Sequence, residues 1–362
     1  MRRAPALIVG GGPAGATLAL QFARMGIPHL LVERTRETPD ALCGGFLSWH
    51  MLAMLERLGI EGETLNPATV TRVRLVTRDV VAEAPLPSPA RAVSRQRLDT
   101  LLLAAADLAG AAIERGVGVR AVTDGVARLN DGACIGAEAL FLASGKHDTR
   151  GLARPADARG DDPTLGLRVR LAPGRVLDRL VGDAIELHLV DGGYAGLVRQ
   201  EDGSGNLCMA VRRSRLQVAG TPELLLDALG AELPALGERL ALRAADGGID
   251  AVANVPYGWR ATSTTPGIFR LGDQAGVIPS LAGEGMAIAV ASALAAADAY
   301  RADGPGAALS FQRAFAQRLR RPIGIAAAAW HAGEQPWMRG LGVRLARLSP
   351  AVLPLLARAT RV

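Results

Sequence analysis

The pattern of hydrophobic and polar positions predicts a nucleotide-binding unit at the start of the chain. An apolar run at 6–9 leads into a glycine turn, a helical stretch at 16–25 follows, and a second apolar run at 29–32 ends on an acid. Strand, turn, helix and strand in this order form a βαβ unit with parallel strands. Further helices are expected at 50–58 and 97–109, and further strands at 118–122, 127–129 and 139–143.

The middle third of the chain changes to short alternating segments with turn residues between them, which predicts an antiparallel sheet. The expected strands lie at 165–171, 184–190, 193–199, 206–212 and 251–256, and a helical stretch lies at 221–245. A hairpin is also expected at 70–83, and we expect Pro85, Pro87 and Pro89 to end it. A strand-like run at 268–273 and an alanine-rich helix at 286–301 then return to the style of the first region.

The whole pattern predicts an α/β fold in which a Rossmann-like domain is interrupted by a substrate domain built on a mainly antiparallel β-sheet, with a C-terminal helical tail. The Rossmann-like domain is expected to be discontinuous, and the substrate domain is made of two segments. The predicted bounds are 1–70, 92–158 and 264–305 for the first domain, 71–91 and 159–263 for the second, and 306–362 for the tail.

The tail is apolar and basic, and it leaves two interpretations open. Trp330, Trp337 and several leucines lie among arginines, which would suit an interfacial helix that touches acidic lipid. Alternatively, the tail is a helical lid on the substrate domain with its arginines outward. We favour the lid, because prolines are expected to cut the tail into short pieces and to interrupt any continuous amphipathic face. These prolines are Pro322, Pro336, Pro350 and Pro354.

Composition narrows the class of protein. The chain has 362 residues, of which 49% are hydrophobic, so it can bury a core of two domains. The three cysteines lack CxxC spacing, and no apolar run is long enough for a signal peptide or a membrane span. We therefore expect a bacterial cytoplasmic protein, whose tail could contact the inner face of the membrane peripherally. Arginine supplies all but one of the basic residues, which we attribute to a GC-rich genome rather than to a nucleic acid partner. The five histidines lack metal-ligand spacing.

The glycine turn predicts a dinucleotide site. Gly10 permits the tight turn, Gly12 lets the backbone approach a pyrophosphate, and Gly15 lets the helix pack closely on the strand. The N-terminus of the helix offers free N–H groups to the phosphates. Glu33 ends the second strand, where an acid accepts hydrogen bonds from a ribose. The alternative is a strand–helix turn without a ligand.

Three separated motifs together resemble one family. They are the glycine turn with Glu33, Arg95 within Ser94–Asp99, and Gly272-Asp273 followed by Gly283-Glu284-Gly285-Met286. In this order they resemble the FAD-dependent oxidoreductases of the p-hydroxybenzoate hydroxylase superfold. The Cys43–Leu47 box and the Leu281–Gly285 loop are similar to its geranylgeranyl reductase-like branch. The resemblance covers about residues 5–300 and leaves the tail outside.

The resemblance implies FAD as the cofactor. Asp273, at a strand end, would accept hydrogen bonds from ribityl hydroxyls, and loop 279–285 would present N–H groups to the pyrimidine edge of the flavin. Arg95 would supply a cation near the ribityl or phosphate part, unless it is a surface arginine at a helix start. The implied cofactor-binding residues are Gly10, Gly12, Pro13, Ala14, Gly15, Glu33, Arg34, Cys43, Gly44, Gly45, Arg95, Val119, Asp273, Gly283, Gly285 and Met286.

Two further features bear on the chemistry. Cys43 would lie near the flavin ring and is the one catalytic candidate, with a small buried residue as the alternative. Many relatives carry an Asp-Gly motif after the strand that here ends at Ser144-Gly145, whereas this chain has Lys146–Gly151. NADPH or NADH therefore stays open as the electron donor. A Trp-x-Trp-x-Ile-Pro box is absent from the sequence, which disfavours halogenation.

The expected substrate is an apolar or aromatic small molecule of the polyketide or isoprenoid type. The residues expected to line its pocket are Leu187, Leu189, Tyr194, Leu197, Met209, Tyr257 and Trp259. The superfold favours a monooxygenase, and the Cys43 box favours a double-bond reductase of the geranylgeranyl reductase type. A third class is an FAD electron-relay protein, which the altered Lys146–Gly151 segment suggests. Substrate identity and oligomeric state stay open.

Overall fold

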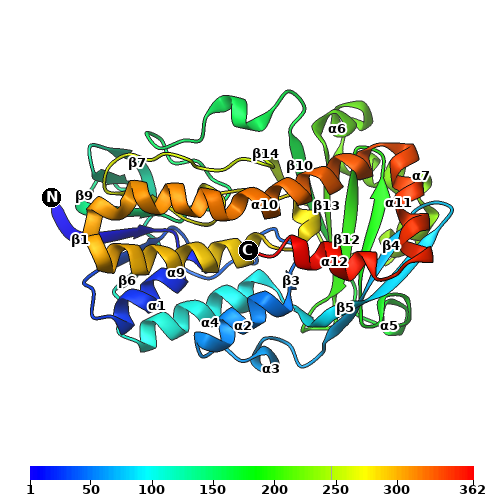
Figure 1. Ribbon diagram of the computed structural model, residues 1–362, viewed down its shortest axis with the longest axis horizontal. Coiled ribbons are helices and arrows are strands. Elements are labelled where there is room, and N and C mark those ends of the chain that lie inside the picture. The colour runs from blue at the N-terminus through cyan, green and yellow to red at the C-terminus, as the bar shows by residue number, and fades with distance from the viewer. Residues whose placement is uncertain (246) are drawn as a thin grey trace.

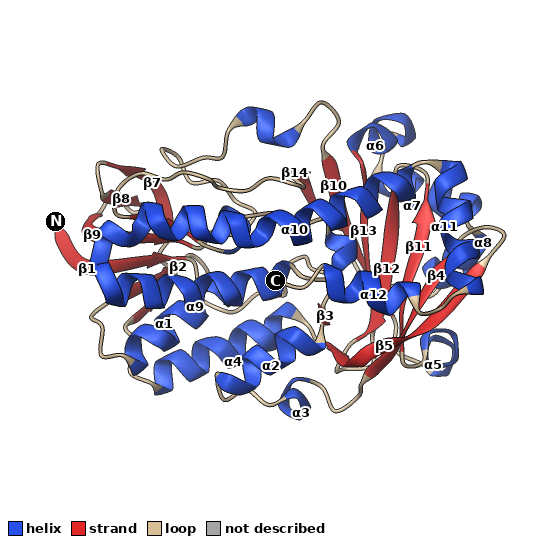
Figure 2. Ribbon diagram, in the orientation of Figure 1, coloured by secondary structure: helices blue, strands red, loops and turns tan. Residues whose placement is uncertain are grey.

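The computed structural model describes residues 1–245 and 247–362, and it arranges them around two sheets. One sheet lies at the end of the molecule that holds the N-terminus, and the other lies at the opposite end (Figure 1). Long helices run along the first sheet and across to the second (Figure 2). The mixed α/β architecture, with an antiparallel-rich sheet and a helical tail, confirms the predicted fold class.

The first sheet has a parallel core. Its strands follow the order β6 (Ile113–Arg115), β2 (Leu30–Glu33), β1 (Arg2–Val9), β9 (Cys134–Leu142), β8 (Val126–Leu129) and β7 (Val119–Thr123), and β15 (Ile268–Arg270) also pairs with β9. All pairs are parallel except those of the β7–β8 hairpin and of β8 with β9. Parallel neighbours need a crossover, which α1 (Pro13–Arg24) supplies between β1 and β2.

Helices cover this sheet and build the main core. They are α1, α2 (Trp49–Arg57), α4 (Arg95–Leu108) and α9 (Gly285–Asp303), with the short α3 (Gly62–Leu65) at the edge. Phe22 of α1 packs edge-on against Phe141 of β9, and Phe141 stacks on Phe269 of β15 with ring centroids 4.6 Å apart. All three rings are fully buried, so the helices hold the carboxyl ends of β1, β9 and β15 in fixed positions.

The second sheet is antiparallel except for one pair. Its strands follow the order β14 (Asp250–Val255), β10 (Thr164–Leu171), β13 (Gly205–Arg212), β12 (Gly193–Arg199), β11 (Ala184–Val190), β4 (Val70–Val76), β5 (Val81–Ala92) and β3 (Phe46–Leu47). The parallel pair is β11 with β4. One face packs on α5 (Arg175–Val181), α6 (Arg213–Ala219), α7 (Pro222–Glu232) and α8 (Pro234–Leu240). The other face is left for a cavity.

Prolines interrupt the chain less than the sequence suggested. Strand β5 runs through Pro85, Pro87 and Pro89, because β5 is next to the edge of the sheet and is paired on its outer side only by the two residues of β3. A register shift in the β4–β5 ladder absorbs the extra residues. The break expected in the hairpin at these prolines was therefore wrong. The break expected at Pro322 of the tail was also wrong, because α10 (Ala308–Glu334) continues through this buried residue.

The tail continues from α10 into two shorter helices, α11 (Pro336–Leu348) and α12 (Val352–Ala359). Buried Val343, Ala346 and Leu353 pack against Ala82 and Ala84 of β5. The tail thus closes over the second sheet, on the side opposite to α5–α8 (Figure 1). Among the described residues, no single helix is long and apolar enough to cross a bilayer, whereas α11 and α12 together reach that length and composition but bend by 114° at their junction.

Candidate cofactor and substrate cavity

One large cavity of about 1260 Å³ connects the two sheets. It begins at the glycine turn after β1, passes the ends of β9 and β15, and continues along the open face of the second sheet to the inner side of α11 and α12. This volume exceeds that of a pocket for one small ligand. It leaves room for a dinucleotide and a second molecule end to end.

The glycine turn has the geometry that its sequence predicted. Gly10 has φ of +107°, and a Cβ there would lie 2.6 Å from the carbonyl oxygen of Ala143. A Cβ on Gly15 would lie 1.8 Å from the carbonyl oxygen of Gly10, so Gly15 lets α1 pack on the turn and does not itself line the cavity. No side chain caps α1 at Gly12, which leaves the first turn of the helix open toward the cavity.

Glu33 is held rigidly at the wall of the cavity. Its Oε2 accepts a hydrogen bond of 2.6 Å from the backbone N–H of Gly11. Its Oε1 accepts bonds from the backbone N–H and the hydroxyl of Thr35, at 2.9 and 2.8 Å. The neighbouring Arg34 also lines the cavity, with Nη2 at 3.1 Å from Nε2 of His147. A carboxylate fixed in this way has further lone pairs for a ribose hydroxyl.

Arg95 is the first residue of α4, and its guanidinium lies beside the start of α1 rather than on an open surface. A Cβ on Gly12 would lie 3.3 Å from Nη2 of Arg95. The guanidinium is held by Asp99, one helical turn further along α4, through bonds of 2.9 and 2.6 Å. Burial raises the pKa of Asp99, and the charge of Arg95 works against that rise. The Arg95–Asp99 spacing of four residues, about one helical turn, is the feature of the sequence that indicates this pair.

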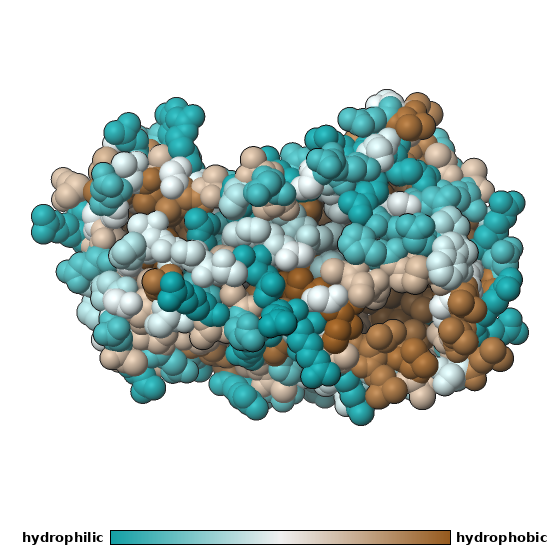
Figure 3. Space-filling model, turned by 45° about the horizontal axis from the view of Figure 1, so that its top comes forward, coloured by the Kyte–Doolittle hydropathy of each residue, from teal (hydrophilic) through white to brown (hydrophobic). Residues whose placement is uncertain are grey.

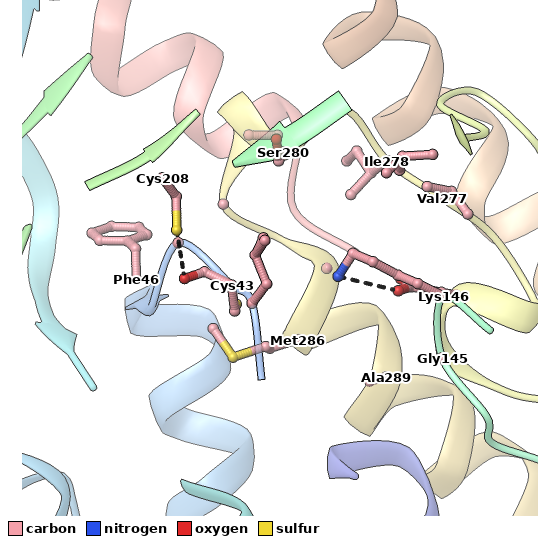
Figure 4. Close-up of a pocket in the computed structure, with 18 of the residues that line it drawn as sticks. Cys43, Phe46, Gly145, Lys146, Cys208, Val277, Ile278, Ser280, Met286 and Ala289 are labelled. Atoms are coloured by element: carbon pink, nitrogen blue, oxygen red, sulfur yellow. Dashed lines mark hydrogen bonds and ion pairs between the residues drawn. The ribbon is translucent and has the colours of Figure 1, made fainter. Parts of the chain in front are cut away.

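Asp273 and Lys146 meet at the next part of the cavity. Asp273 lies in a short 3₁₀ turn, Gly272–Gln274, directly after β15. Nζ of Lys146, the only lysine of the chain, lies 3.7 Å from Oδ2 of Asp273 (Figure 4). Arg154 donates to the backbone oxygen of Asp273 at 3.2 Å. The segment that departs from the Asp-Gly motif thus places a cation beside the predicted ribityl ligand.

The Cys43 box is fixed to the second sheet through its backbone. The carbonyl oxygen of Cys43 accepts a hydrogen bond from the thiol of Cys208 at 3.0 Å (Figure 4). It also accepts one from Nδ2 of Asn206 at 2.9 Å. Burial raises the pKa of the Cys208 thiol to about 12, so this thiol keeps its proton. Gly45 has φ of +71°. Cys43, Gly44 and Gly45 all line the cavity.

The N-terminus of α9 faces the same region. Gly283, Gly285 and Met286 line the cavity, and no side chain caps the helix. A Cβ on Gly283 would lie 2.9 Å from the ring of Phe46, so only glycine lets the loop pack against the Cys43 box. Buried Glu284 accepts a hydrogen bond of 2.8 Å from Ser48 and one from Arg361. The last residues of the chain are thereby tied to this loop.

A cluster of aromatic hydroxyls stands where the cavity becomes apolar. The hydroxyl of Tyr194 donates to Oγ of Ser280 at 2.8 Å, and the hydroxyl of Tyr257 lies 2.5 Å from the same oxygen. Burial raises the pKa of Tyr257 to about 12 and raises that of Tyr194 as well, so both phenols stay protonated. Trp330 of α10 packs edge-on against both rings. Ser280 and Trp330 were not predicted to line the cavity, since both reach it only through tertiary packing.

Five of the seven residues expected in the substrate pocket line the cavity, and two do not. Side chains alternate along β12, and Leu197 lies on the face that packs against α5–α8, opposite to Tyr194. Trp259 lies outside the lining and has the guanidinium of Arg154 over its ring, 5.9 Å from the centroid. The apolar part is lined by the predicted Leu187 and Leu189, and also by Val73, Leu75, Leu345, Leu353 and Leu356.

The remaining predicted cofactor residues lie together. Pro13, Ala14 and Val119 line the same cavity as the residues described above. Of the sixteen residues expected to bind the cofactor, Gly15 alone lies behind the wall. The structure thus brings residues from three distant parts of the chain to one cavity.

Comparisons with known proteins agree with this geometry. Residues 3–149 match a family of FAD binding domains. A menaquinone reductase from Mycolicibacterium smegmatis is 31% identical over 160 residues, which are 41% of this chain and 39% of that relative. The chain therefore matches less than half of the length of that protein.

Solved structures show that the fold is shared over nearly the whole chain. A geranylgeranyl bacteriochlorophyll reductase-like protein from Thermoplasma acidophilum has a TM-score of 0.73 at 19% identity, covering 92% of this chain and 88% of the other. PqsL, a probable FAD-dependent monooxygenase from Pseudomonas aeruginosa, has a TM-score of 0.69 at 19% identity, covering 94% and 99%. This coverage includes most of the tail, which we had expected to lie outside the resemblance.

Proposed function

Because residues 3–149 match an FAD binding domain and the chain has the fold of the p-hydroxybenzoate hydroxylase superfold, we propose that it is an FAD-dependent oxidoreductase acting on a long apolar small molecule. The observation that carries this proposal is the continuity of the cavity. Its polar part holds the residues suited to FAD, and its apolar part begins where the flavin would end.

The residues present fit FAD in three ways. The open first turn of α1, with the cation of Arg95 beside it, suits the pyrophosphate, and the anchored Glu33 suits the adenosine ribose. Asp273 would accept hydrogen bonds from the ribityl hydroxyls. The uncapped N-terminus of α9 would place its positive end at the pyrimidine edge, where a reduced flavin carries negative charge. When bound, FAD would supply the redox chemistry of the site.

The apolar part of the cavity supports the choice of substrate. Leucines from β11, α11 and α12 form its walls, and the charged residues Glu334 and Arg339, which also line the cavity, are paired with Arg212 and Asp191. An isoprenoid or polyketide chain would bury its length there and place its reactive end toward the Tyr194–Ser280–Tyr257 cluster. Trp330 would provide a flat apolar wall beside that end. Closure by α10–α12 would keep water from the reacting atoms.

Two reactions are compatible with this arrangement, and we propose oxygen insertion as the first. A water-poor, apolar pocket suits a monooxygenase, and PqsL, described as a probable FAD-dependent monooxygenase, shares the fold. The second candidate is reduction of a double bond, which needs a proton on one carbon after hydride arrives on the other. The protonated phenols of Tyr194 and Tyr257 could donate that proton, and the partial match to a menaquinone reductase also favours this candidate.

Mass spectrometry of products separates the two reactions. The FAD-loaded protein would be incubated with NADPH or NADH and with isoprenoid and polyketide lipids, once in air and once without oxygen. A product heavier by one oxygen, formed in air alone, supports oxygen insertion. A product heavier by two hydrogens, formed without oxygen, supports reduction and overturns the first candidate. The Cys43→Ser variant belongs in the same assay, since an unchanged single-turnover rate would exclude a catalytic role for Cys43.

The electron donor is tested separately. We propose that NADPH or NADH reduces the bound flavin directly, with its nicotinamide docking outside the Glu33 site. Stopped-flow absorbance of the flavin after mixing with each nucleotide measures this step. If neither nucleotide reduces the flavin at a useful rate, a protein partner must deliver or accept electrons, and the electron-relay interpretation gains support.

A further inference from the structure

The outer side of α11 and α12 is an unusually apolar surface. Eight of the fourteen large apolar side chains exposed by the described residues lie on these two helices. On α11 they follow helical spacing, so they form one stripe along the helix. We call this set the outer face; it consists of Trp337, Met338, Leu341, Leu345, Leu348, Val352, Leu355 and Leu356. Figure 3 shows hydrophobic residues gathered around a hollow at this end of the molecule.

Positive charge is concentrated in the same part of the chain, which contains α11 and α12. Residues 335–362 contain five arginines and no acidic residue, while the whole chain has a net charge of +6. These residues therefore carry a charge of +5, and the rest of the chain together carries only +1. Arg344, Arg347 and Arg358 are exposed beside the outer face. Exposed apolar side chains flanked by arginines match an anionic lipid surface, because the arginines meet phosphate headgroups while the apolar side chains enter the hydrocarbon boundary.

The inner side of the same helices belongs to the cavity. Buried Val343, Ala346 and Leu353 line its apolar part, and the partly exposed Leu345 and Leu356 of the outer face reach the same cavity at its rim. Helices α11 and α12 are therefore the wall between the outer face and the apolar end of the cavity. The two helices bend by 114° at their junction, so they can follow a surface but do not form one straight span.

We propose that the outer face docks on an anionic membrane and that the apolar end of the cavity then opens toward the bilayer. Docking itself is independent of the reaction. The assignment of the substrate as a lipid that is delivered from the membrane rests on the proposed function. The lid and interfacial-helix interpretations of the tail are thereby combined, since the inner side covers the cavity and the outer side contacts lipid.

Vesicle flotation of the FAD-loaded, full-length protein tests the docking without any substrate. The protein should float with vesicles of phosphatidylglycerol and phosphatidylcholine, and far less with phosphatidylcholine alone. The combined variant Trp337→Ser, Leu341→Ser, Leu348→Ser and Leu355→Ser should bind at least about tenfold more weakly, because it removes most of the buried apolar contact. These four residues are exposed and do not line the cavity. The matched control is Leu108→Ser with Val218→Ser, both 89% exposed on other helices.

A second variant tests the charge. Arg344→Gln, Arg347→Gln and Arg358→Gln together should weaken binding to anionic vesicles by about fivefold for each arginine, and added salt should have the same effect on the wild type. The control variant, Arg120→Gln with Arg175→Gln and Arg301→Gln, removes the same charge from exposed sites elsewhere and should bind like the wild type. Equal losses of vesicle binding in both variants would show that only the net charge of the protein matters. That result would overturn the assignment of the outer face as the docking site.

Tryptophan fluorescence gives the position of the outer face. Trp337 is 69% exposed, whereas Trp330 is buried, so docking should shift the emission to the blue, and lipids brominated in their acyl chains should quench it. The Trp337→Phe variant should lose both signals. Absence of flotation by the wild type would overturn the proposal. A dimer in analytical ultracentrifugation that the serine variant dissociates would also overturn it, since the outer face would then contact a second copy of the chain.

Discussion

Glu33 is the side chain that most directly ties the adenosine end of the cavity to its cofactor. In Glu33→Gln the charge is lost, and an NH₂ group must face the N–H of Gly11 or of Thr35. We expect FAD to bind at least about tenfold more weakly, because hydrogen bonds to a charged acceptor contribute about 1.5–3 kcal/mol. Titration of the apoprotein with FAD, followed by flavin fluorescence, measures the change.

The neighbouring Glu37 offers a control of the same chemistry. Its side chain is exposed and does not line the cavity, so Glu37→Gln should leave the dissociation constant of FAD unchanged. Equal affinities for the Glu33→Gln variant and the wild type would contradict a ribose contact at Glu33.

Glu186 makes the stability of the fold depend on pH. It lies in β11 of the second sheet and faces Arg239 of α8. It is fully buried, with Nε2 of His188 at 2.9 Å and two hydrogen bonds of 3.0 Å from Arg239. Burial alone would raise its pKa, but the hydrogen bonds and charges of His188 and Arg239 lower it from 4.5 to about 2. Because the folded pKa is the lower one, this stabilisation is present above about pH 4.5 and is lost as the pH falls toward 2.

The Glu186→Gln variant isolates this contribution. A pKa lowered by this amount corresponds to about 3 kcal/mol of unfolding free energy. Urea unfolding should show a difference between the wild type and Glu186→Gln that shrinks by about that amount between about pH 6 and about pH 2. A difference that stays constant over this range would show that Glu186 does not titrate with a lowered pKa.

At the scale of elements, the position of α1 depends on the absence of one methyl group. A Cβ on Gly15 would lie 1.8 Å from the carbonyl oxygen of Gly10, so Gly15→Ala must push α1 away from the turn. We expect a loss of about 1–3 kcal/mol in unfolding free energy, together with weaker FAD binding, because the phosphate-facing N–H groups move with the helix. Thermal unfolding and FAD titration measure the two effects.

A glycine in another helix serves as the reference for this substitution. Gly324 is exposed within α10, and a Cβ there would meet no atom within 4 Å. Gly324→Ala should therefore keep FAD binding and stabilise the fold by up to about 1 kcal/mol. If Gly15→Ala behaved in the same way, close packing of α1 on the turn would not be what the cofactor site requires.

Elements could be predicted from the sequence wherever local pattern decides them. The βαβ unit around Gly10–Gly15 and the strands 184–190 and 193–199 follow from apolar runs, periodicity and turn residues, and the structure has them. The prolines of β5 and Pro322 misled the prediction, because tolerance of proline depends on whether the strand is near an edge and on how the helix packs. A sequence alone supplies neither.

The residues of the site likewise divide into those that could be predicted from the sequence and those that could not. Motif residues such as Gly12 and Arg95 could be placed together through a family resemblance, since their order along the chain is characteristic. Leu197 was misplaced because alternation along β12 gives two faces but does not tell which one meets the cavity. Ser280 and Trp330 were missed because they meet Tyr194 only after loop 279–285 and α10 have packed on the second sheet.

At the scale of the whole molecule, the two sheets contribute to one cavity but carry separable tasks. The first sheet and the helices α1, α4 and α9 supply the polar part, and the second sheet with α11 and α12 supplies the apolar part. The Cys43 box joins them, because its backbone is held by Asn206 and Cys208 of β13 while its glycines lie at the cavity wall. An obstruction in the apolar part should therefore leave the polar part intact.

Leu187→Trp provides that obstruction. Leu187 points into the cavity from β11, opposite Gly196 of β12, and a larger ring there would fill the space expected for an apolar chain. We expect FAD affinity to stay within about twofold of the wild type, while binding of a fluorescent fatty acid falls by at least about tenfold, because the site loses the volume that buries the chain. The control is Val176→Trp, half-exposed on α5 and outside the cavity, which should change neither measurement. If Leu187→Trp weakened FAD binding as strongly as fatty acid binding, the two parts of the cavity would not be separable, and the assignment of the apolar part to the substrate would have to be abandoned.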